Sequence, residues 1–230
     1  MRVLHVSSGI DPRQGGPTTV LTALIAAQIE AGLRVSVAAT FGEDFRDDAA
    51  RQMRECGATV ELIGPCTHRL AWHKGIRPAL GRMIGDADIV HIHGVWEEIQ
   101  HQAAKIARRR RVAYIITPHG MLDPWSLARG GFKKRLYLML RLRRHLNRAA
   151  AVHFSDATER DLTLRAVSIR SPALVQRHIV DLREFDNPPP RGTFRQRFPA
   201  TTDKPIVLFL SRLHPKKGLN LLIAAFADAE

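Results

Sequence analysis

Residues 1–31 read MRVLHVSSGIDPRQGGPTTVLTALIAAQIEA, and this stretch predicts a strand, a glycine loop and a helix in that order. Val3–Val6 is a short apolar run that fits a buried strand. Thr18–Ala31 carries apolar side chains at intervals of three and four, the spacing of a helix with one buried face: Leu21, Leu24, Ile25 and Ile29. The start of the chain lacks a small-residue cleavage site, so we interpret it as a strand and not as a secretion signal.

The same alternation continues along most of the chain. Further short apolar runs predict strands at Arg34–Ala39, Thr59–Ile63, Ile89–His93, Val112–Ile116, Ala151–Phe154 and Ile206–Leu210. Helical spacing is found near residues 44–56, 69–85, 97–109, 131–149 and 156–166. Strands that alternate with helices form right-handed crossovers. We therefore predict an α/β fold, a Rossmann-like parallel sheet with helices on both faces.

Consecutive prolines interrupt this pattern at Pro188–Pro190, where they exclude both a helix and a central strand. We therefore predict a first Rossmann-like domain at 1–186, a linker at 187–204 and a second domain that begins at 205–230. One strand and one helix cannot enclose a core of their own, so we expect 205–230 to represent only the opening of a truncated second Rossmann-like domain.

Composition indicates a folded protein with no membrane-spanning run, since 45% of its residues are apolar and no long stretch is of low complexity. Cys56 and Cys66 lack the spacing of a zinc site, and we expect free thiols in a reducing cytosol. The formal net charge of +13 favours polyanionic partners such as nucleotide phosphates, nucleic acid or anionic lipid.

A glycine pair, Gly15 and Gly16, lies between the first strand and the first helix. Paired glycines allow close approach of the backbone to a ligand, and the amides of a helix start attract an anion. The alternative is that the glycines only make a tight turn. The loop lacks the Gly-x-Gly-x-x-Gly and Gly-Lys-Ser/Thr patterns, which disfavours a nicotinamide site and a Walker A loop.

Two predicted strands end in the same dipeptide, His93-Gly94 and His119-Gly120. The carboxyl ends of parallel strands border the ligand crevice of such a sheet, so both imidazoles are placed to contact a phosphate or a sugar hydroxyl. Either histidine alone fits equally well as a strand cap that binds no ligand. Their occurrence at successive strand ends favours a functional role.

The segment Ile206–Leu222 is the most specific part of the sequence. An apolar strand leads to Arg212, and Lys217 comes just before a helix, whose start attracts negative charge. Two cations at this spacing can hold a diphosphate. The alternative is a pair of solvated loop charges.

With this segment the chain resembles the family 4 glycosyltransferases of GT-B fold. Their second domain opens with an apolar strand, Gly-Arg-Leu, a few residues and Lys-Gly before a helix, and here Ser211 stands at the usual glycine position. The resemblance extends over nearly the whole chain, through the glycine pair, the His119-Gly120 turn and the basic helix before Ala149–His153.

The resemblance implies transfer of a sugar from a UDP- or GDP-sugar to a glycan or lipid-linked acceptor, with retention at the anomeric carbon and no obligatory metal. It implies that Arg212 and Lys217 bind the donor diphosphate near Gly15 and Gly16. His119 would contact the transferred sugar or its phosphate. A role in cell-surface polysaccharide or lipopolysaccharide synthesis follows from the acceptors common in the family.

Two departures from the family pattern affect these expectations. The stretch Arg177–Asp181 stands where the family usually has Pro-Asn-Gly-Val-Asp. The family's Glu-x7-Glu pair falls beyond Glu230, so we expect this polypeptide alone to be inactive.

The acceptor side is less defined by the sequence. His93, Trp96 and Asp123 follow predicted strand ends and are candidates for acceptor binding, although structural roles fit each of them equally well. None of the candidate residues is predicted to bind a metal.

The predicted helix at 131–149 combines basic residues with an apolar surface. Lys134 and Arg141 are seven residues apart, and the helix could lie on an anionic membrane or pack its apolar side on the sheet. With the resemblance, the first alternative predicts a cytoplasmic protein attached peripherally to the inner face of the cell membrane.

Two other functions remain open at this point. The charge permits nucleic-acid binding, but the chain has no helix-turn-helix signature, aromatic RNA motif or zinc spacing, so we expect no nucleic-acid partner. A GT-B sugar-nucleotide epimerase would share the architecture, and the segment from Arg212 to Lys217 favours the transferase over it.

Overall fold

The six predicted strands of the first domain and one further strand form a parallel sheet of seven strands in the computed structural model, which describes residues 1–67, 70–129, 131–182 and 185–228. Its strands are β1 (Arg2–Ser7), β2 (Arg34–Thr40), β3 (Thr59–Ile63), β4 (Ile89–His93), β5 (Ala113–Thr117), β6 (Ala151–Phe154) and β7 (Ala173–Val175). Their order is β3-β2-β1-β4-β5-β6-β7, and each neighbouring pair is parallel. The predicted α/β class is confirmed, and β7 is an additional edge strand that the sequence analysis missed.

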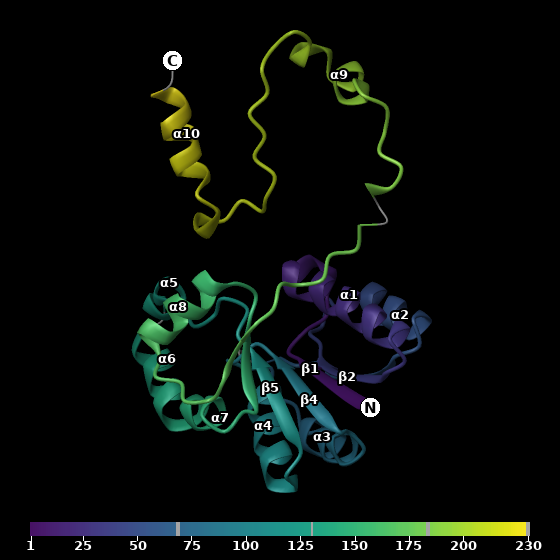
Figure 1. Cartoon of the computed structure of the whole chain (residues 1–230), viewed down its shortest axis with the longest axis vertical. Coiled ribbons are helices and arrows are strands. Elements are labelled where there is room, and N and C mark those ends of the chain that lie inside the picture. Colours follow the sequence, from purple (N-terminus) through teal and green to yellow (C-terminus); the bar gives the residue numbers. More distant parts are fainter. Residues whose placement is uncertain (68–69, 130, 183–184, 229–230) are drawn as a thin grey trace. The chain divides into compact units, whose positions relative to one another are not determined.

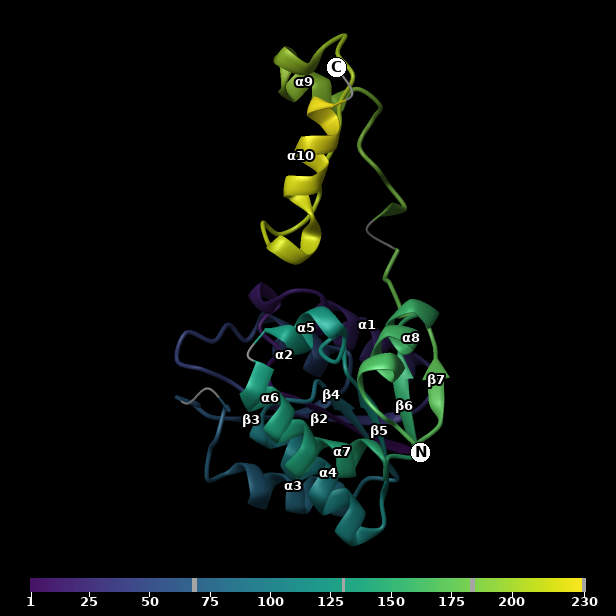
Figure 2. The same ribbon diagram turned by 90° about the vertical axis from the view of Figure 1, so that its left-hand side faces the viewer.

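Helices cover both faces of the sheet (Figures 1 and 2). They are α1 (Gly16–Glu30), α2 (Asp48–Glu55), α3 (Ile76–Gly85), α4 (Glu98–Arg110), α5 (Pro124–Ala128), α6 (Gly131–Tyr137), α7 (Arg143–Leu146) and α8 (Ala157–Ala166). A π-helical segment, Leu138–Leu142, joins α6 to α7. The helix expected near 69–85 begins only at Ile76, and residue 69 lies outside the described residues.

Two hydrophobic clusters hold the helices on opposite faces. One packs α3 and α4 against alternate residues of the central strands, including Val90, Ile92 and Ile116. The other packs α1 and α2 against Val35 and Val37 of β2. Because side chains alternate between the faces of a strand, residues 91 and 93 of β4 lie on the face opposite α3 and α4.

Local signals account for where several helices begin. Glu97 and Gln100 form a capping box at the start of α4, and the Asp156 carboxylate accepts from the Glu159 backbone at the start of α8. α4 ends where Arg111 takes a left-handed conformation, with φ of 59°.

The chain divides into two compact units, Met1–Asp181 and Leu182–Glu230. The described residues of the second unit include α9 (Thr193–Arg197), the 3-10 turns Pro199–Thr201 and Pro215–Lys217, and α10 (Leu219–Ala227). The strand expected at Ile206–Leu210 is not formed among the described residues, and Leu210 is 89% exposed. A strand requires hydrogen-bonded neighbours, and no described segment pairs with this one.

Candidate functional site

The candidate residues of the first unit meet at one edge of the sheet. Since the strands are parallel, the carboxyl ends of β1, β4, β5 and β6 lie at the same edge (Figure 1). The strand order reverses between β1 and β4, and ligands of doubly wound sheets bind in the crevice beside such a switch point. The glycine loop follows β1, and the two His-Gly turns follow β4 and β5.

Gly15 has the conformation that the glycine loop requires. Its φ of 99° and ψ of −152° lie in a region that only glycine adopts readily, and α1 begins at the next residue. Gly16 is exposed, and a Cβ built on it would contact no atom within 4 Å. The two glycines therefore differ: Gly15 shapes the turn, whereas Gly16 leaves space at the start of the helix.

Asp11, which was not among the predicted site residues, organises this loop. The buried carboxylate accepts from the Arg13 backbone and pairs with the Arg13 guanidinium at 2.6 Å. It also accepts from the Arg46 backbone at 3.4 Å, which joins the loop to the segment after β2. The hydrogen bonds from Arg13 hold the pKa of Asp11 well below its usual range. The Asp-Pro pair at 11–12 was the available signal, because aspartate is a common cap before proline.

Substitutions of the two glycines should distinguish an effect on the stability of the fold from an effect on nucleotide-sugar binding. Gly15→Ala is expected to lower the free energy of unfolding by about 1–3 kcal/mol, because alanine is strained at that backbone conformation. Gly16→Ala is expected to leave stability unchanged, since its methyl group meets open space. If a donor phosphate approaches Gly16, Gly16→Ala should weaken nucleotide-sugar binding about tenfold in a protein that contains a complete second domain. Calorimetric titration measures this, and unchanged binding would place the phosphate elsewhere.

A histidine cluster lies on the sheet face opposite α3 and α4, next to the carboxyl edge. The histidine cluster consists of His5 of β1, His91 and His93 of β4, His119 after β5, His153 of β6 and His178. His5 pairs in register with His91, so the two imidazoles stand side by side on neighbouring strands. Of these six residues, only His93 and His119 were predicted from the sequence as site residues. The His-x-His spacing at 91 and 93 could have indicated that His91 lies on the same face of the strand as His93.

Two hydrogen-bonded chains run through this cluster. In the first, His5 Nε2 lies 2.8 Å from Gln28 Oε1, His5 Nδ1 lies 3.0 Å from His93 Nε2, and His93 Nδ1 lies 3.1 Å from His119 Nε2. In the second, Thr117 Oγ1 lies 2.7 Å from His91 Nε2 and 2.9 Å from His153 Nδ1. His153 Nε2 then donates to the Gln176 carbonyl oxygen at 2.8 Å.

Burial keeps the first chain neutral. It lowers the pKa of His5 to about 4 and that of His93 well below the usual value of 6.5. The pKa of His119 falls to about 4, mainly through burial and further through repulsion from His178 and His153. Potential ligand atoms of His5, His91 and His93 lie within 4.8 Å of one another, so neutral imidazoles that could hold a metal ion also meet here.

The turn at His119 is fixed by the neighbouring helix. His119 and Gly120 both adopt left-handed conformations, with φ of 53° and 68°. Glu159 of α8 accepts from the Gly120 backbone at 2.6 Å and from the Ser155 backbone at 2.8 Å. Its carboxylate therefore joins the ends of β5 and β6. Glu159 could not be predicted from the sequence, since its partner Gly120 is 39 residues away.

Removing that carboxylate should loosen the turn. Glu159→Ala is expected to lower the free energy of unfolding by about 2 kcal/mol, because it leaves backbone donors without a charged acceptor. Glu159→Gln retains a hydrogen-bond acceptor, so its free energy of unfolding should fall by less than that of Glu159→Ala. Urea unfolding measures both, with Glu55→Ala on the exposed side of α2 as the control. A Glu159→Ala loss equal to that of the control would show that the turn is held by other contacts.

The three residues expected near the acceptor have structural partners. His93 is buried, and both its ring nitrogens lie within hydrogen-bond distance of other histidines. Trp96 packs on the core and lies 5.8 Å from the Tyr137 ring. Asp123 caps α5 by accepting from the Ser126 backbone at 2.5 Å. These contacts account for the three side chains without a ligand.

Arg212 and Lys217 belong to the second unit, where both side chains are exposed. The His214 ring accepts from the Lys216 backbone, and Gly218 ends the turn with φ of 68° immediately before α10. The predicted Lys-Gly turn at a helix start is thus present within this unit.

The two basic residues chosen as membrane contacts are engaged within the first unit. Lys134 donates to the Ser126 carbonyl oxygen at 2.6 Å and lies 5.3 Å from the Trp96 ring centroid. Arg141 pairs with Glu98 of α4 at 3.1 Å. Their charges therefore help to hold α6 and the π-helical segment on the domain.

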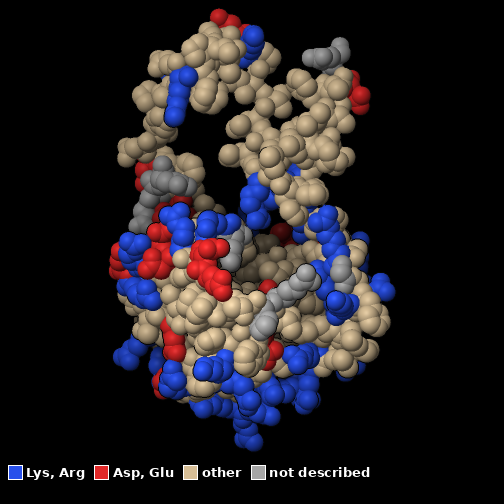
Figure 3. Space-filling model, turned by 180° about the vertical axis from the view of Figure 1, so that it is seen from behind, with Lys and Arg blue, Asp and Glu red and all other residues tan. Residues whose placement is uncertain are grey.

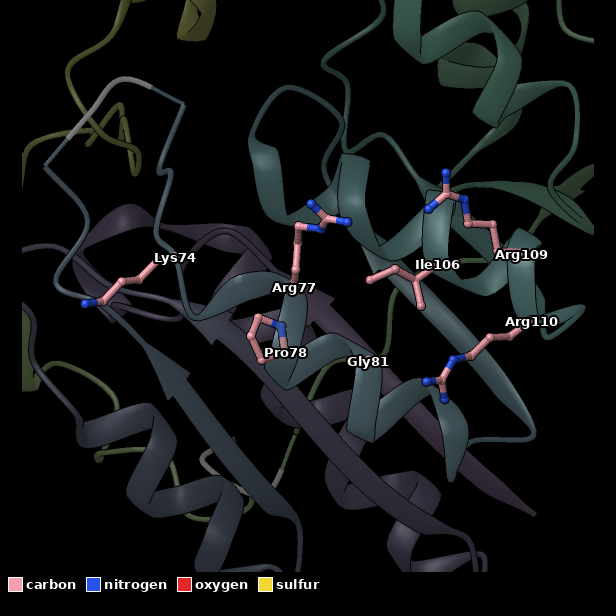
Figure 4. Close-up of a pocket in the computed structure, with 7 residues that line it drawn as sticks. All are labelled: Lys74, Arg77, Pro78, Gly81, Ile106, Arg109 and Arg110. Carbon is pink, nitrogen blue, oxygen red and sulfur yellow. The ribbon is translucent and has the colours of Figure 1, made fainter.

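Other basic side chains gather where α4 ends, on the surface seen at the bottom of Figure 3. An open groove of about 610 Å³ lies between α3 and α4 (Figure 4) and is lined by Lys74, Arg77, Pro78, Gly81, Ile106, Arg109 and Arg110. It is on the face of the sheet opposite the histidine cluster, so the two sites are separate.

Comparison with known proteins relates this architecture to sugar transfer. A relative from Mycolicibacterium smegmatis, the GDP-mannose-dependent alpha-(1-6)-phosphatidylinositol monomannoside mannosyltransferase, is 26% identical over 98% of this chain and 56% of its own length. The crystal structure of Anabaena HepE with UDP and glucose superposes with a TM-score of 0.68, at 19% identity, over 100% of this chain and 58% of that one.

A glycosyltransferase structure from Rickettsia africae gives the same TM-score of 0.68 at 15% identity, over 100% of this chain and 57% of the other. At such identities these structures show the shared GT-B fold alone. The chain spans somewhat more than half the length of these proteins. The sequence pattern of the glycosyl transferase 4-like domain matches residues 15–176, which is most of the chain. This chain therefore belongs to the glycosyl transferase 4-like domain family.

Proposed function

We propose that this chain forms the acceptor-side domain of a glycosyltransferase that moves a sugar from a nucleotide-sugar donor to a glycan or lipid-linked acceptor, with retention and without an obligatory metal. The observation that carries the proposal is that the glycine loop after β1 and the His119 turn after β5 lie at the same carboxyl edge of the sheet, beside the switch point, in a chain whose sequence matches this family. The family match also favours transfer over the epimerase alternative, and over binding of nucleic acid.

The donor is a UDP- or GDP-sugar in this proposal. The M. smegmatis relative uses GDP-mannose, and the Anabaena structure contains UDP and glucose. Arg212 and Lys217 would bind the diphosphate, since both are exposed and flank a turn that opens a helix. Gly15 and Gly16 would allow the phosphates to approach α1, and His119 would contact the transferred sugar. His93, Trp96 and Asp123 would shape the acceptor side through the contacts described above.

The acceptor is a lipid-linked glycan or a lipopolysaccharide or polysaccharide precursor at the cytoplasmic face of the membrane. The relative acts on a phosphatidylinositol mannoside, an acceptor that lies in a bilayer. None of the described helices is long and apolar enough to cross a bilayer. Reaching such an acceptor would then require a surface that binds the membrane interface.

The surface from α6 to the π-helical segment fits that role through its apolar side chains. Phe132, Met139 and Leu140 are 80%, 64% and 66% exposed, and basic residues flank them. An exposed apolar stripe with basic neighbours is typical of helices that lie in a membrane interface. Phe132→Ser with Leu140→Ser is expected to weaken binding to anionic vesicles at least about tenfold, because two apolar side chains no longer insert. Vesicle co-sedimentation measures this.

The matched control for the vesicle experiment is Leu162→Ser with Leu164→Ser on α8, where two leucines are also exposed. It should leave vesicle binding unchanged. Equal losses of vesicle binding in the two double variants would indicate non-specific hydrophobic adsorption and would exclude a specific membrane surface on α6.

Transfer itself is tested with this chain joined to a complete second domain. The protein is incubated with GDP-mannose or UDP-glucose and a phosphatidylinositol mannoside acceptor, and the product anomer is identified by NMR. Glycosylated lipid with the donor's anomeric configuration supports the proposal. An altered sugar nucleotide without transfer would indicate an epimerase, and no turnover with any nucleotide sugar would reject both. The 230-residue chain alone is expected to transfer no sugar.

A further inference from the structure

The buried chain from Gln28 to His119 has a direction that is set at its inner end. Gln28 Oε1 is an amide oxygen and can only accept, so the proton at the 2.8 Å contact belongs to His5 Nε2. His5 is fully buried, and the hydrogen-bond partners of its ring are the uncharged groups Gln28 and His93. A buried imidazole without a carboxylate partner is neutral and carries one ring proton. His5 Nδ1 therefore has a lone pair and accepts.

The position of the proton on His5 determines the positions of the protons on His93 and His119. The proton between His5 Nδ1 and His93 Nε2 must belong to His93 Nε2, which leaves His93 Nδ1 as an acceptor. The proton at the next contact then belongs to His119 Nε2. His119 lies in the turn at the carboxyl edge of the sheet, and its remaining nitrogen, Nδ1, has a lone pair.

We propose that Gln28, His5 and His93 are positioning residues that hold His119 as its Nε2–H tautomer, so that Nδ1 accepts a hydrogen bond from a sugar hydroxyl. The inference rests on the proposed function for the identity of the ligand, whereas the tautomer follows from the hydrogen bonds. The lone pair on His119 Nδ1 cannot form a hydrogen bond with an oxygen of the diphosphate, because that oxygen has no proton to donate. His119 therefore recognises the sugar and not the diphosphate.

The positioning of His119 has a second component that is independent of the histidines. Glu159 holds the Gly120 backbone, so the ring enters the cluster from a backbone fixed in the left-handed region. Gln28 lies on α1, the helix that starts at the glycine loop. One helix would thus carry both the proposed donor loop at its start and the residue that sets the tautomer of His119.

NMR of the chain with 15N-labelled histidine tests the tautomer without any activity assay. Long-range 15N–1H correlations at pH 7.5 should show His5, His93 and His119 as neutral Nε2–H tautomers. In Gln28→Met the fixed acceptor is lost, and all three are expected to become mixtures of the two tautomers. Gln28→Glu keeps an oxygen acceptor and should preserve the wild-type pattern.

Thr117→Val is the matched control, because it breaks the second chain and leaves the first intact. It should change the signals of His91 and His153 only. A wild-type His119 found as the Nδ1–H tautomer or charged at this pH overturns the proposal, as does an unchanged tautomer in folded Gln28→Met. Histidine signals that shift on addition of EDTA would show a metal ion between His5 and His93 in place of the proton, and would also overturn it.

Activity distinguishes this inference from the proposed function. In a protein that joins this chain to a complete second domain, Gln28→Met is expected to lower kcat/KM about tenfold. The loss is smaller than the roughly 10⁴-fold loss that a wholly wrong histidine tautomer causes in serine proteases, because Gln28→Met leaves a mixture of the two tautomers. Gln28→Glu should retain activity. If the tautomers respond as expected but no variant transfers sugar, the proposed function fails alone. If sugar is transferred and Gln28→Met has no effect on kcat/KM, the positioning role fails alone.

Discussion

His119→Ala is expected to lower kcat/KM for sugar transfer about 100-fold in a protein with a complete second domain, the effect of removing one hydrogen-bonding group from a reacting centre. His119 occupies the turn after β5, and its Nε2 is held by His93. Alanine removes the acceptor for the sugar hydroxyl and leaves His93 Nδ1 without its donor. Steady-state kinetics with the donor varied measures the loss.

The control for this variant must match its backbone. Alanine at a positive φ has a small backbone strain that does not depend on the role of the side chain it replaces. Arg111 also has a positive φ, 59°, but lies at the end of α4, on the opposite edge of the sheet from His119. Arg111→Ala should therefore show a similar backbone effect on stability and full activity. Full activity in His119→Ala, or equal losses of activity in both, would remove His119 from the site.

Acid is expected to destabilise the chain strongly below pH 6.5. Buried histidines bind protons more weakly in the folded state, so the unfolded chain binds more protons between the two pKa values, and the free energy of unfolding falls as pH falls. For His5, a fall of the pKa from 6.5 to about 4 corresponds to about 3 kcal/mol of stability. This stability is present above pH 6.5 and is lost as pH falls towards 4.

His145 should add to this dependence from a separate place. It is buried beside His101, whose Nδ1 lies 3.0 Å from His145 Nε2. Burial is the main reason that its pKa falls to about 3, and the charges of His101, Arg108, Arg144 and Lys105 lower it further. Urea unfolding at a series of pH values between 4 and 8 measures the combined slope.

Two variants test whether these histidines cause the acid sensitivity. His145→Leu is expected to flatten part of the slope because it removes one buried titrating ring. His214→Gln replaces an exposed histidine in the other unit and should not change the profile of the first unit. A stability that stays constant from pH 7 to 4.5 would contradict the neutral, buried state of the cluster.

The sequence by itself determined the α/β class, the positions of most strands and helices, and the family. These features are local: apolar spacing defines each element, and glycine or proline marks its ends. The His-Gly turns could be found for the same reason, since a dipeptide after a predicted strand places a side chain at the carboxyl edge. The strand predicted at Ile206–Leu210 was wrong for this chain, because an apolar run becomes a strand only beside a partner.

Only the tertiary structure decided which side chains meet. His5 and His93 are 88 residues apart, and nothing between them in the sequence records that β1 and β4 are neighbours. The sequence predicted Lys134 and Arg141 as basic residues of a helix that contacts an anionic membrane or packs on the sheet, and it gave no sign that the Ser126 carbonyl and Glu98 would be their partners. Periodicity fixes the face on which a residue lies, but the order of the strands fixes its neighbours, and that order results from the burial of the whole sheet.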